Sequence, residues 1–119
     1  MANKRQLKKR IDYVCSELAY EFQLAACITP EPDFEAIADI VHRLAALQNK
    51  TRSRVNFSFD KTPAEFETPR QYAAARRAYN KAAYERLRED YSKALADIIK
   101  DMNRVVPAES REAIYRGVE

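Results

Sequence analysis

The fold is decided by residues 68–106, which read TPRQYAAARRAYNKAAYERLREDYSKALADIIKDMNRVV. Thr68 suits the position just before a helix, Pro69 suits the first turn, and Gln71 completes a helix-start pattern. No Gly or Pro follows before Pro107, so the stretch predicts one uninterrupted helix, roughly 55 Å long at ~1.5 Å per residue. The whole chain contains a single Gly and abundant Ala, Glu, Lys, Arg and Leu, a composition that favours an all-α fold.

The apolar residues of this long helix form two stripes instead of one. The upstream stripe comprises Tyr72, Ala75, Tyr79, Ala82 and Ala83. The downstream stripe comprises Leu87, Tyr91, Ala94, Leu95, Ile98, Met102 and Val105. Because the two stripes are displaced by about 100° around the helix, we expect its two halves to face different neighbours.

Two shorter amphipathic helices are predicted upstream. The first spans residues 4–28, and its apolar positions recur every three or four residues at Leu7, Ile11, Val14, Leu18, Phe22 and Ala25. Two prolines in the turn 29–33 end it, and Asp33 suits the N-cap of a second helix over 33–54. The stripe of the second helix comprises Phe34, Ile37, Ile40, Val41, Leu44, Leu47 and Val55.

The sequence therefore predicts an all-α antiparallel bundle of three main helices within one domain, residues 1–119. After Pro107, residues 108–116 suit a short C-terminal helix ended by Gly117. The first helix also has a second apolar face on the side opposite its core stripe, formed by Tyr13, Tyr20, Leu24 and Cys27. That face needs a partner, which is either another helix of the same chain or a second subunit. We expect a homodimer with this face as its interface.

A phenylalanine-rich segment separates the second and third helices. It contains Phe57, Phe59 and Phe66, and residues 55–60 alternate like a strand, although a lone strand cannot form a sheet. Long loops usually have a reason to exist. Three phenylalanines in a loop therefore either cap the end of the bundle, the interpretation we favour, or form a docking loop for another molecule.

Charges are segregated along the chain despite a net charge of only +3. Residues 1–10 carry five cations, residues 11–42 carry seven acids and no Lys or Arg, and residues 43–61 carry five cations. In an antiparallel hairpin this order creates a basic end, formed by Lys4, Arg5, Lys8, Lys9, Lys50, Arg52 and Arg54. We expect Arg70, Arg76 and Arg77 to return to the same end. These cations are either solvated or contact an anion such as a nucleic-acid backbone.

The sequence contains no complete signature of a metal site, a disulfide or a catalytic site. His42 is the only His, so Asp39 and His42 supply just half of a carboxylate-bundle metal site. Cys15 and Cys27 lie roughly 18 Å apart within one helix, too far for a disulfide, and two unpaired thiols indicate the cytoplasm. No catalytic, cofactor-binding or metal-binding residue is predicted.

We also expect no export signal. The motif that ends at Cys27 looks like a lipoprotein cleavage site, but such a site needs an uncharged apolar run before it. Asp12, Glu17 and Glu21 interrupt that run.

The opening residues 3–18, with NKRQLKK followed by VCSEL, resemble the start of a group of small uncharacterised all-helical bacterial proteins. The resemblance implies cytosolic helices and brings with it neither an activity nor functional residues. The sequence thus predicts a non-enzymatic protein-interaction or oligomerisation domain without a cofactor. Nucleic-acid binding through the basic end is the alternative.

Overall fold

The computed structural model describes residues 3–106, and every long element in this range is a helix. The elements are α1 (Lys4–Ile28), α2 (Phe34–Arg54), the short 3-10 helix η1 (Pro63–Glu65) and α3 (Pro69–Val105). The described residues contain no strand, so the predicted all-α fold with three main helices is confirmed. The C-terminal helix predicted at 108–116 lies outside the described residues.

Each α-helix begins at a side chain that accepts a hydrogen bond from the backbone N–H three residues later. The acceptors are Asn3, Asp33 and Thr68, with donor–acceptor distances of 2.8, 3.1 and 3.1 Å. Pro69 occupies the first position of α3, where its missing N–H removes no helical hydrogen bond. The helix boundaries therefore follow directly from local sequence.

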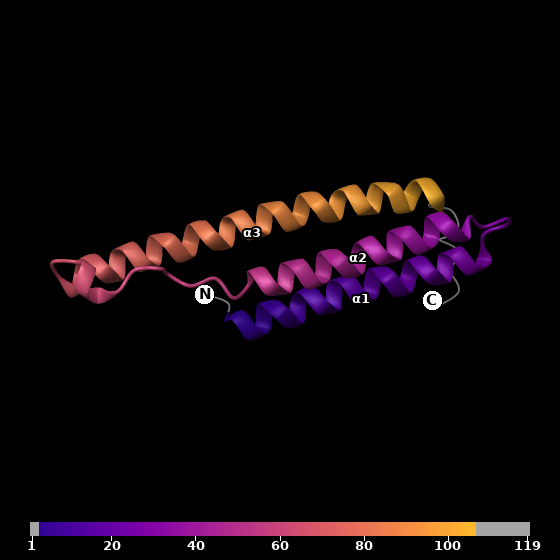
Figure 1. The fold of residues 1–119 in the computed structure, drawn as a ribbon. Helices are drawn as coiled ribbons and strands as arrows, with labels where there is room; N and C mark the ends of the chain where they lie inside the picture. Colours follow the sequence, from indigo (N-terminus) through magenta and orange to yellow (C-terminus); the bar gives the residue numbers. More distant parts are fainter. Residues whose placement is uncertain (1–2, 107–119) are drawn as a thin grey trace, which may run out of the picture.

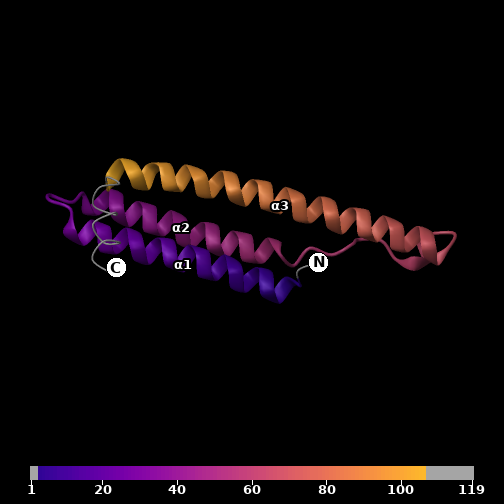
Figure 2. The same ribbon diagram turned by 180° about the vertical axis from the view of Figure 1, so that it is seen from behind.

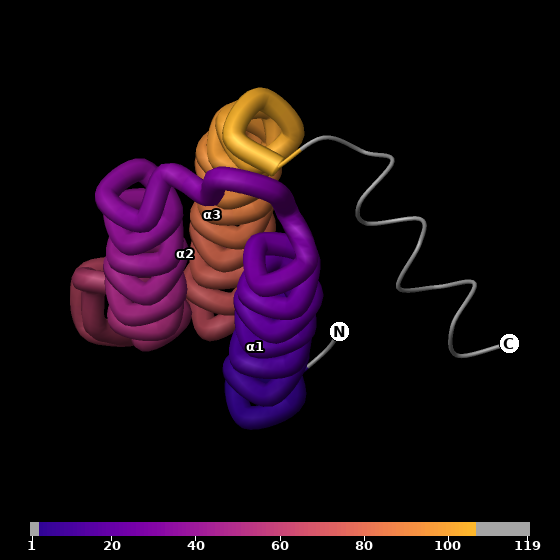
Figure 3. The backbone as a smooth tube through the Cα atoms, turned by 90° about the vertical axis from the view of Figure 1, so that its right-hand side faces the viewer, coloured from indigo at the N-terminus to yellow at the C-terminus, as the bar shows by residue number. Residues whose placement is uncertain are grey.

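The helices form a bundle in which α2 runs antiparallel to both α1 and α3, so α1 and α3 point the same way (Figures 1 and 2). Viewed along the bundle, α3 lies over the junction between α1 and α2 (Figure 3). The buried apolar residues, drawn from all three helices and their ends, are Ile11, Cys15, Phe22, Ala25, Ala26, Ile40, Leu44, Val55, Leu87, Ile98, Met102 and Val106.

The start of α3 projects far beyond the hairpin of α1 and α2 (Figure 1). We call this projection, residues 56–86, the arm; it comprises the loop with η1 and the first half of α3. Within residues 3–106, no buried residue falls in the arm. The molecule measures 66 × 30 × 17 Å, and its radius of gyration is 19.5 Å. A compact domain of this size would have a radius of gyration of about 13 Å, so the protein is a rod.

The exposure of Phe34 differs from the predicted core in one detail. Its position in the stripe of α2 predicts burial, but its side chain is 76% exposed. Phe34 is the first residue of α2 and lines a shallow groove together with Gln23 and Val41, on a side of the hairpin to which α3 contributes no lining residue. The apolar stripe of α2 is thus wider than the surface that α3 covers.

Candidate interaction surfaces

The outer face of α1, formed by Tyr13, Tyr20, Leu24 and Cys27, lies on the side opposite the core. Tyr13 and Tyr20 are 67% and 62% exposed. Cys27 is exposed and Leu24 is half-buried. On the inner side of the same helix, Cys15 is buried. The helix therefore has two apolar faces, and the bundle covers one of them.

Asp12 of α1 links α1 to α2 at the basic end of the bundle. Its two carboxylate oxygens accept a hydrogen bond from Gln48 at 2.8 Å and pair with Arg52 at 3.4 Å, which joins α1 to α2. Arg54 pairs with Asp90 of α3 at 2.9 Å. These pairs are partly exposed, so each contributes at most ~1 kcal/mol. Two of the seven candidate anion contacts therefore bind carboxylates within the fold.

The opposite end of the bundle contains one further link between helices. Arg43 of α2 donates a hydrogen bond to Asp101 of α3 at 2.7 Å. This hydrogen bond is the main reason why the pKa of the Asp101 carboxyl lies below its usual range; the nearby charges of Arg104 and Lys100 act in the same direction. Ion pairs thus join α2 to α3 near both ends of their contact.

A groove opens between the start of α1, residues 57–59 and α3, with a volume of about 740 Å³. We call it the arm groove. Its apolar lining includes Leu7, Phe57, Phe59 and Tyr84, and its cations are Lys4, Arg76, Arg77 and Lys81. Lys4 donates a hydrogen bond to the Phe57 carbonyl, and its Nζ lies 4.8 Å from the centre of the Phe57 ring. Arg76 and Arg77 thus lie near Lys4, whereas Arg70, in the first turn of α3, lies about 9 Å farther along the arm.

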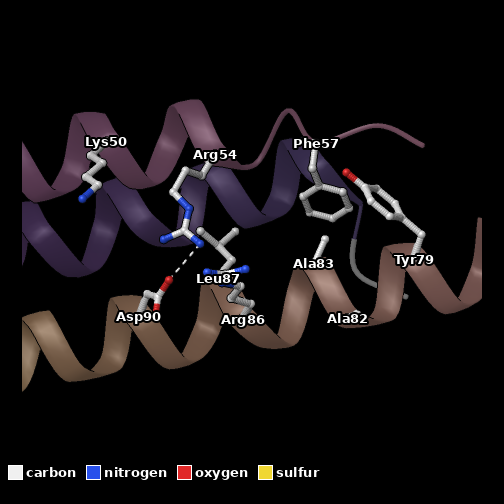
Figure 4. Close-up of a pocket in the computed structure, with 9 residues that line it drawn as sticks. All are labelled: Lys50, Arg54, Phe57, Tyr79, Ala82, Ala83, Arg86, Leu87 and Asp90. Carbon is white, nitrogen blue, oxygen red and sulfur yellow. Dashed lines mark ion pairs between the residues drawn. The ribbon is translucent and has the colours of Figure 1, made fainter. Parts of the chain in front are cut away.

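A second cavity, of about 660 Å³, lies beside Phe57 (Figure 4). Lys50, Arg54 and Arg86 contribute its cations, and Figure 4 shows Arg54 reaching Asp90 across it. Phe57 lines both cavities. The basic end and the arm therefore share one continuous region in which cations alternate with aromatic rings.

The phenylalanine segment packs along α3. The Phe59 ring centre lies 5.4 Å from Tyr79, 5.8 Å from Tyr72 and 6.1 Å from Phe66. The upstream stripe of α3 thus faces this segment, while its downstream stripe faces α1 and α2. Phe59 and Phe66 do not cover the end of the bundle; Phe57, beneath Lys4, is the one that lies there. A docking role for the segment stays a prediction.

Cys15 is buried, and its surroundings lower the reactivity of its thiol. Its sulfur lies 3.6 Å from the hydroxyl of Tyr91. Burial raises the pKa of the Cys15 thiol, an effect that the hydrogen bond with Tyr91 only partly opposes. Because the thiolate is the reactive form, the protonated thiol is a poor nucleophile. Burial likewise raises the pKa of Tyr91.

We expect the two cysteines to react with a maleimide at very different rates. Cys27 is exposed on the outer face of α1 and should react within the mixing time in the single chain, obtained by dilution, whereas Cys15 should react only when the bundle opens. Mass spectrometry would count one label per native chain and two per chain unfolded in urea. A Cys27→Ser variant should show no rapid phase. Equal rates for both thiols would contradict the buried position of Cys15.

The chain matches no protein-family model, no curated protein and no solved structure. No helix within residues 3–106 is both long enough and apolar enough to span a bilayer. In the same part of the chain, no three His, Cys, Asp or Glu side chains gather as metal ligands. The residues considered for a metal, Asp39 and His42, lie exposed on α2.

Proposed function

We propose that the protein is a non-enzymatic, cytosolic interaction domain that forms a homodimer through the outer face of α1. The observation that carries this proposal is the exposure of Tyr13 and Tyr20 on the side of α1 that faces away from the core. Tyrosine is enriched at protein interfaces because it buries a large ring and keeps a polar hydroxyl. Two free cysteines support the cytosolic assignment.

The rod shape also supports the proposal that a second subunit covers part of the surface. A helix within a compact domain buries one face and leaves a polar face in water. Here the outer face of α1 carries two tyrosines, and the arm stands away from the hairpin with no buried residue of its own among those described. A second subunit that covers these surfaces would bury apolar area, worth about 25 cal/mol per Å².

Light-scattering mass tests the dimer. The wild-type protein should have twice the chain mass of 13.8 kDa at both low and high salt, because the burial of the tyrosine rings does not weaken when salt screens charges. Tyr13→Glu/Tyr20→Glu should have the mass of one chain with unchanged helicity, because two buried carboxylates cost far more than the lost contacts. Tyr13→Phe/Tyr20→Phe should remain a dimer.

Phe34→Glu is the matched control, because Phe34 is an equally exposed aromatic residue outside the proposed interface. This variant should keep the wild-type mass. A double glutamate variant that remains a dimer would refute the assigned interface. A wild-type protein that stays a single chain, and forms a salt-sensitive complex with a mixed nucleic-acid pool, would replace the proposal with the nucleic-acid alternative.

A further inference from the structure

The described chain is divided into two halves of opposite charge. The basic half, residues 3–16 and 48–90, contains the basic end and the arm and has fifteen Lys and Arg against seven Asp and Glu. The acidic half, residues 17–47 and 91–106, has eight Asp and Glu against four Lys and Arg. A rod with this distribution attracts a second copy of itself in the antiparallel orientation and repels one in the parallel orientation.

The arm groove lies in the basic half, and most of its cations lack an acidic partner. Among residues 3–106, the ion pairs involve Arg43, Arg52, Arg54 and Arg104. Arg76, Arg77 and Lys81 therefore have no carboxylate within 4.0 Å in the described part of the chain. A complementary occupant of this groove must combine apolar groups with carboxylates.

The outer face of α1 has this combination. Glu17 lies between Tyr13 and Tyr20 on the same side of the helix, since steps of three and four residues return to one face. Glu21 lies at the edge of that face, one turn from Glu17. Neither glutamate belongs to an ion pair within residues 3–106. The outer face thus offers aromatic rings with carboxylates beside them.

We infer that the arm groove of one subunit receives the outer face of α1 of a second copy, in an antiparallel pair. This inference rests on the proposed homodimer and names the surface on which each α1 docks. Glu17 and Glu21 of the partner subunit would then meet Arg76, Arg77 and Lys81, while the partner's Tyr20 would lie against the apolar wall of the groove.

The positions of the two surfaces along the rod permit this arrangement. The contact between Cys15 and Tyr91 sets the level of α1 relative to α3, and the two helices are parallel. Glu17 therefore lies level with Lys93, about 24 Å along the rod from Arg77. A two-fold axis halfway between them and perpendicular to the rod places each outer face at the level of the other subunit's groove. Both contacts form within the same dimer, so neither subunit keeps a free groove or outer face that could bind a third copy.

The arrangement also enlarges the interface beyond a single helix face. Roughly 20–30 residues per subunit form a stable interface of standard size. The outer face of α1 offers only about a third of the 25 residues of that helix. Each subunit of the antiparallel pair contributes both its outer face and its arm groove. With two surfaces, each subunit contributes more residues to the interface than one helix face could.

A charge exchange between two variants tests the inference. Arg76→Glu/Arg77→Glu and Glu17→Arg/Glu21→Arg should each raise the dimer dissociation constant by about 100-fold or more, because like charges then meet at both contacts. An equimolar mixture should regain the wild-type dissociation constant to within about 10-fold, because both contacts of the mixed pair then join opposite charges. Native mass spectrometry would identify the mixed dimer by its mass.

Lys93→Glu/Lys100→Glu is the matched control, since it changes the charge of α3 by the same amount outside the groove and should leave the dimer intact. A wild-type monomer would overturn both the proposed function and this inference. A wild-type dimer whose two exchange variants also dimerise would overturn only the docking of α1 in the groove. Variants that dissociate and do not form a mixed dimer would overturn it as well.

Discussion

Replacing Phe22 by Ala is expected to lower the free energy of unfolding by about 3–5 kcal/mol, the range for a large aromatic side chain removed from a packed core. Phe22 is 1% exposed and is one of the largest fully buried side chains of the bundle. Small domains have only about 5–15 kcal/mol of stability, so this variant should unfold at much lower urea concentrations. Circular dichroism during urea titration at fixed protein concentration would measure the loss.

The same substitution at Phe34 is the control, because both residues belong to the α1–α2 hairpin and differ in burial. Phe34→Ala should change the free energy of unfolding by no more than about 0.5 kcal/mol, as is usual for exposed positions. Similar losses at the two positions would show that Phe34 is covered in solution and that the core extends beyond the buried residues identified above.

Replacing Phe59 by Ala should release the arm without unfolding the bundle. Phe59 contacts three other aromatic rings, and each aromatic pair contributes about 0.5–1.5 kcal/mol, so local opening should become easier by roughly 2–4 kcal/mol. Amide hydrogen exchange would then quicken by at least about 30-fold in the first three turns of α3. Amides near Leu44 and Ile98 should keep their wild-type rates, because the core lies outside the arm.

Ser58→Ala, next to Phe59 and exposed, should leave exchange in the arm unchanged. Faster exchange throughout all three helices of the Phe59 variant would mean that the arm and the bundle unfold as one unit. Unchanged exchange in the arm would mean that the aromatic contacts do not hold it against α3.

The helices could be predicted from the sequence because their signals are local. Asp33 and Thr68 mark helix starts through side-chain hydrogen bonds that span only three residues. Two prolines end α1, and the absence of Gly and Pro allows α3 to continue for 37 residues. The 3-10 helix η1 was missed, although its signal was present. Thr62 and Glu65 form a capping box of the kind that Thr68 and Gln71 suggested for α3.

The arm could not be predicted, because its structure depends on which surfaces meet. The shift between the two stripes of α3 correctly predicted two neighbours but did not identify them. A loop that caps the bundle and one that follows α3 outward both cover part of Phe59 and Phe66. The arm groove escaped prediction for the same reason. The return of Arg76 to the end that holds Lys4 was expected, but the groove that these cations line with Phe57 and Phe59 depends on the path of the loop.

The arm also sets the order in which the chain can fold. The first buried residues on either side of the turn between α1 and α2, Ala26 and Ile40, are separated by 13 residues, whereas those on either side of the arm, Val55 and Leu87, are separated by more than thirty. Closing the longer loop costs about 0.8 kcal/mol more chain entropy than closing the shorter one. The α1–α2 hairpin therefore forms first, and α3 joins it in a later and slower step. Until that step, Phe22 and Leu44 remain open to other chains, so a newly made protein is most prone to aggregate at this stage.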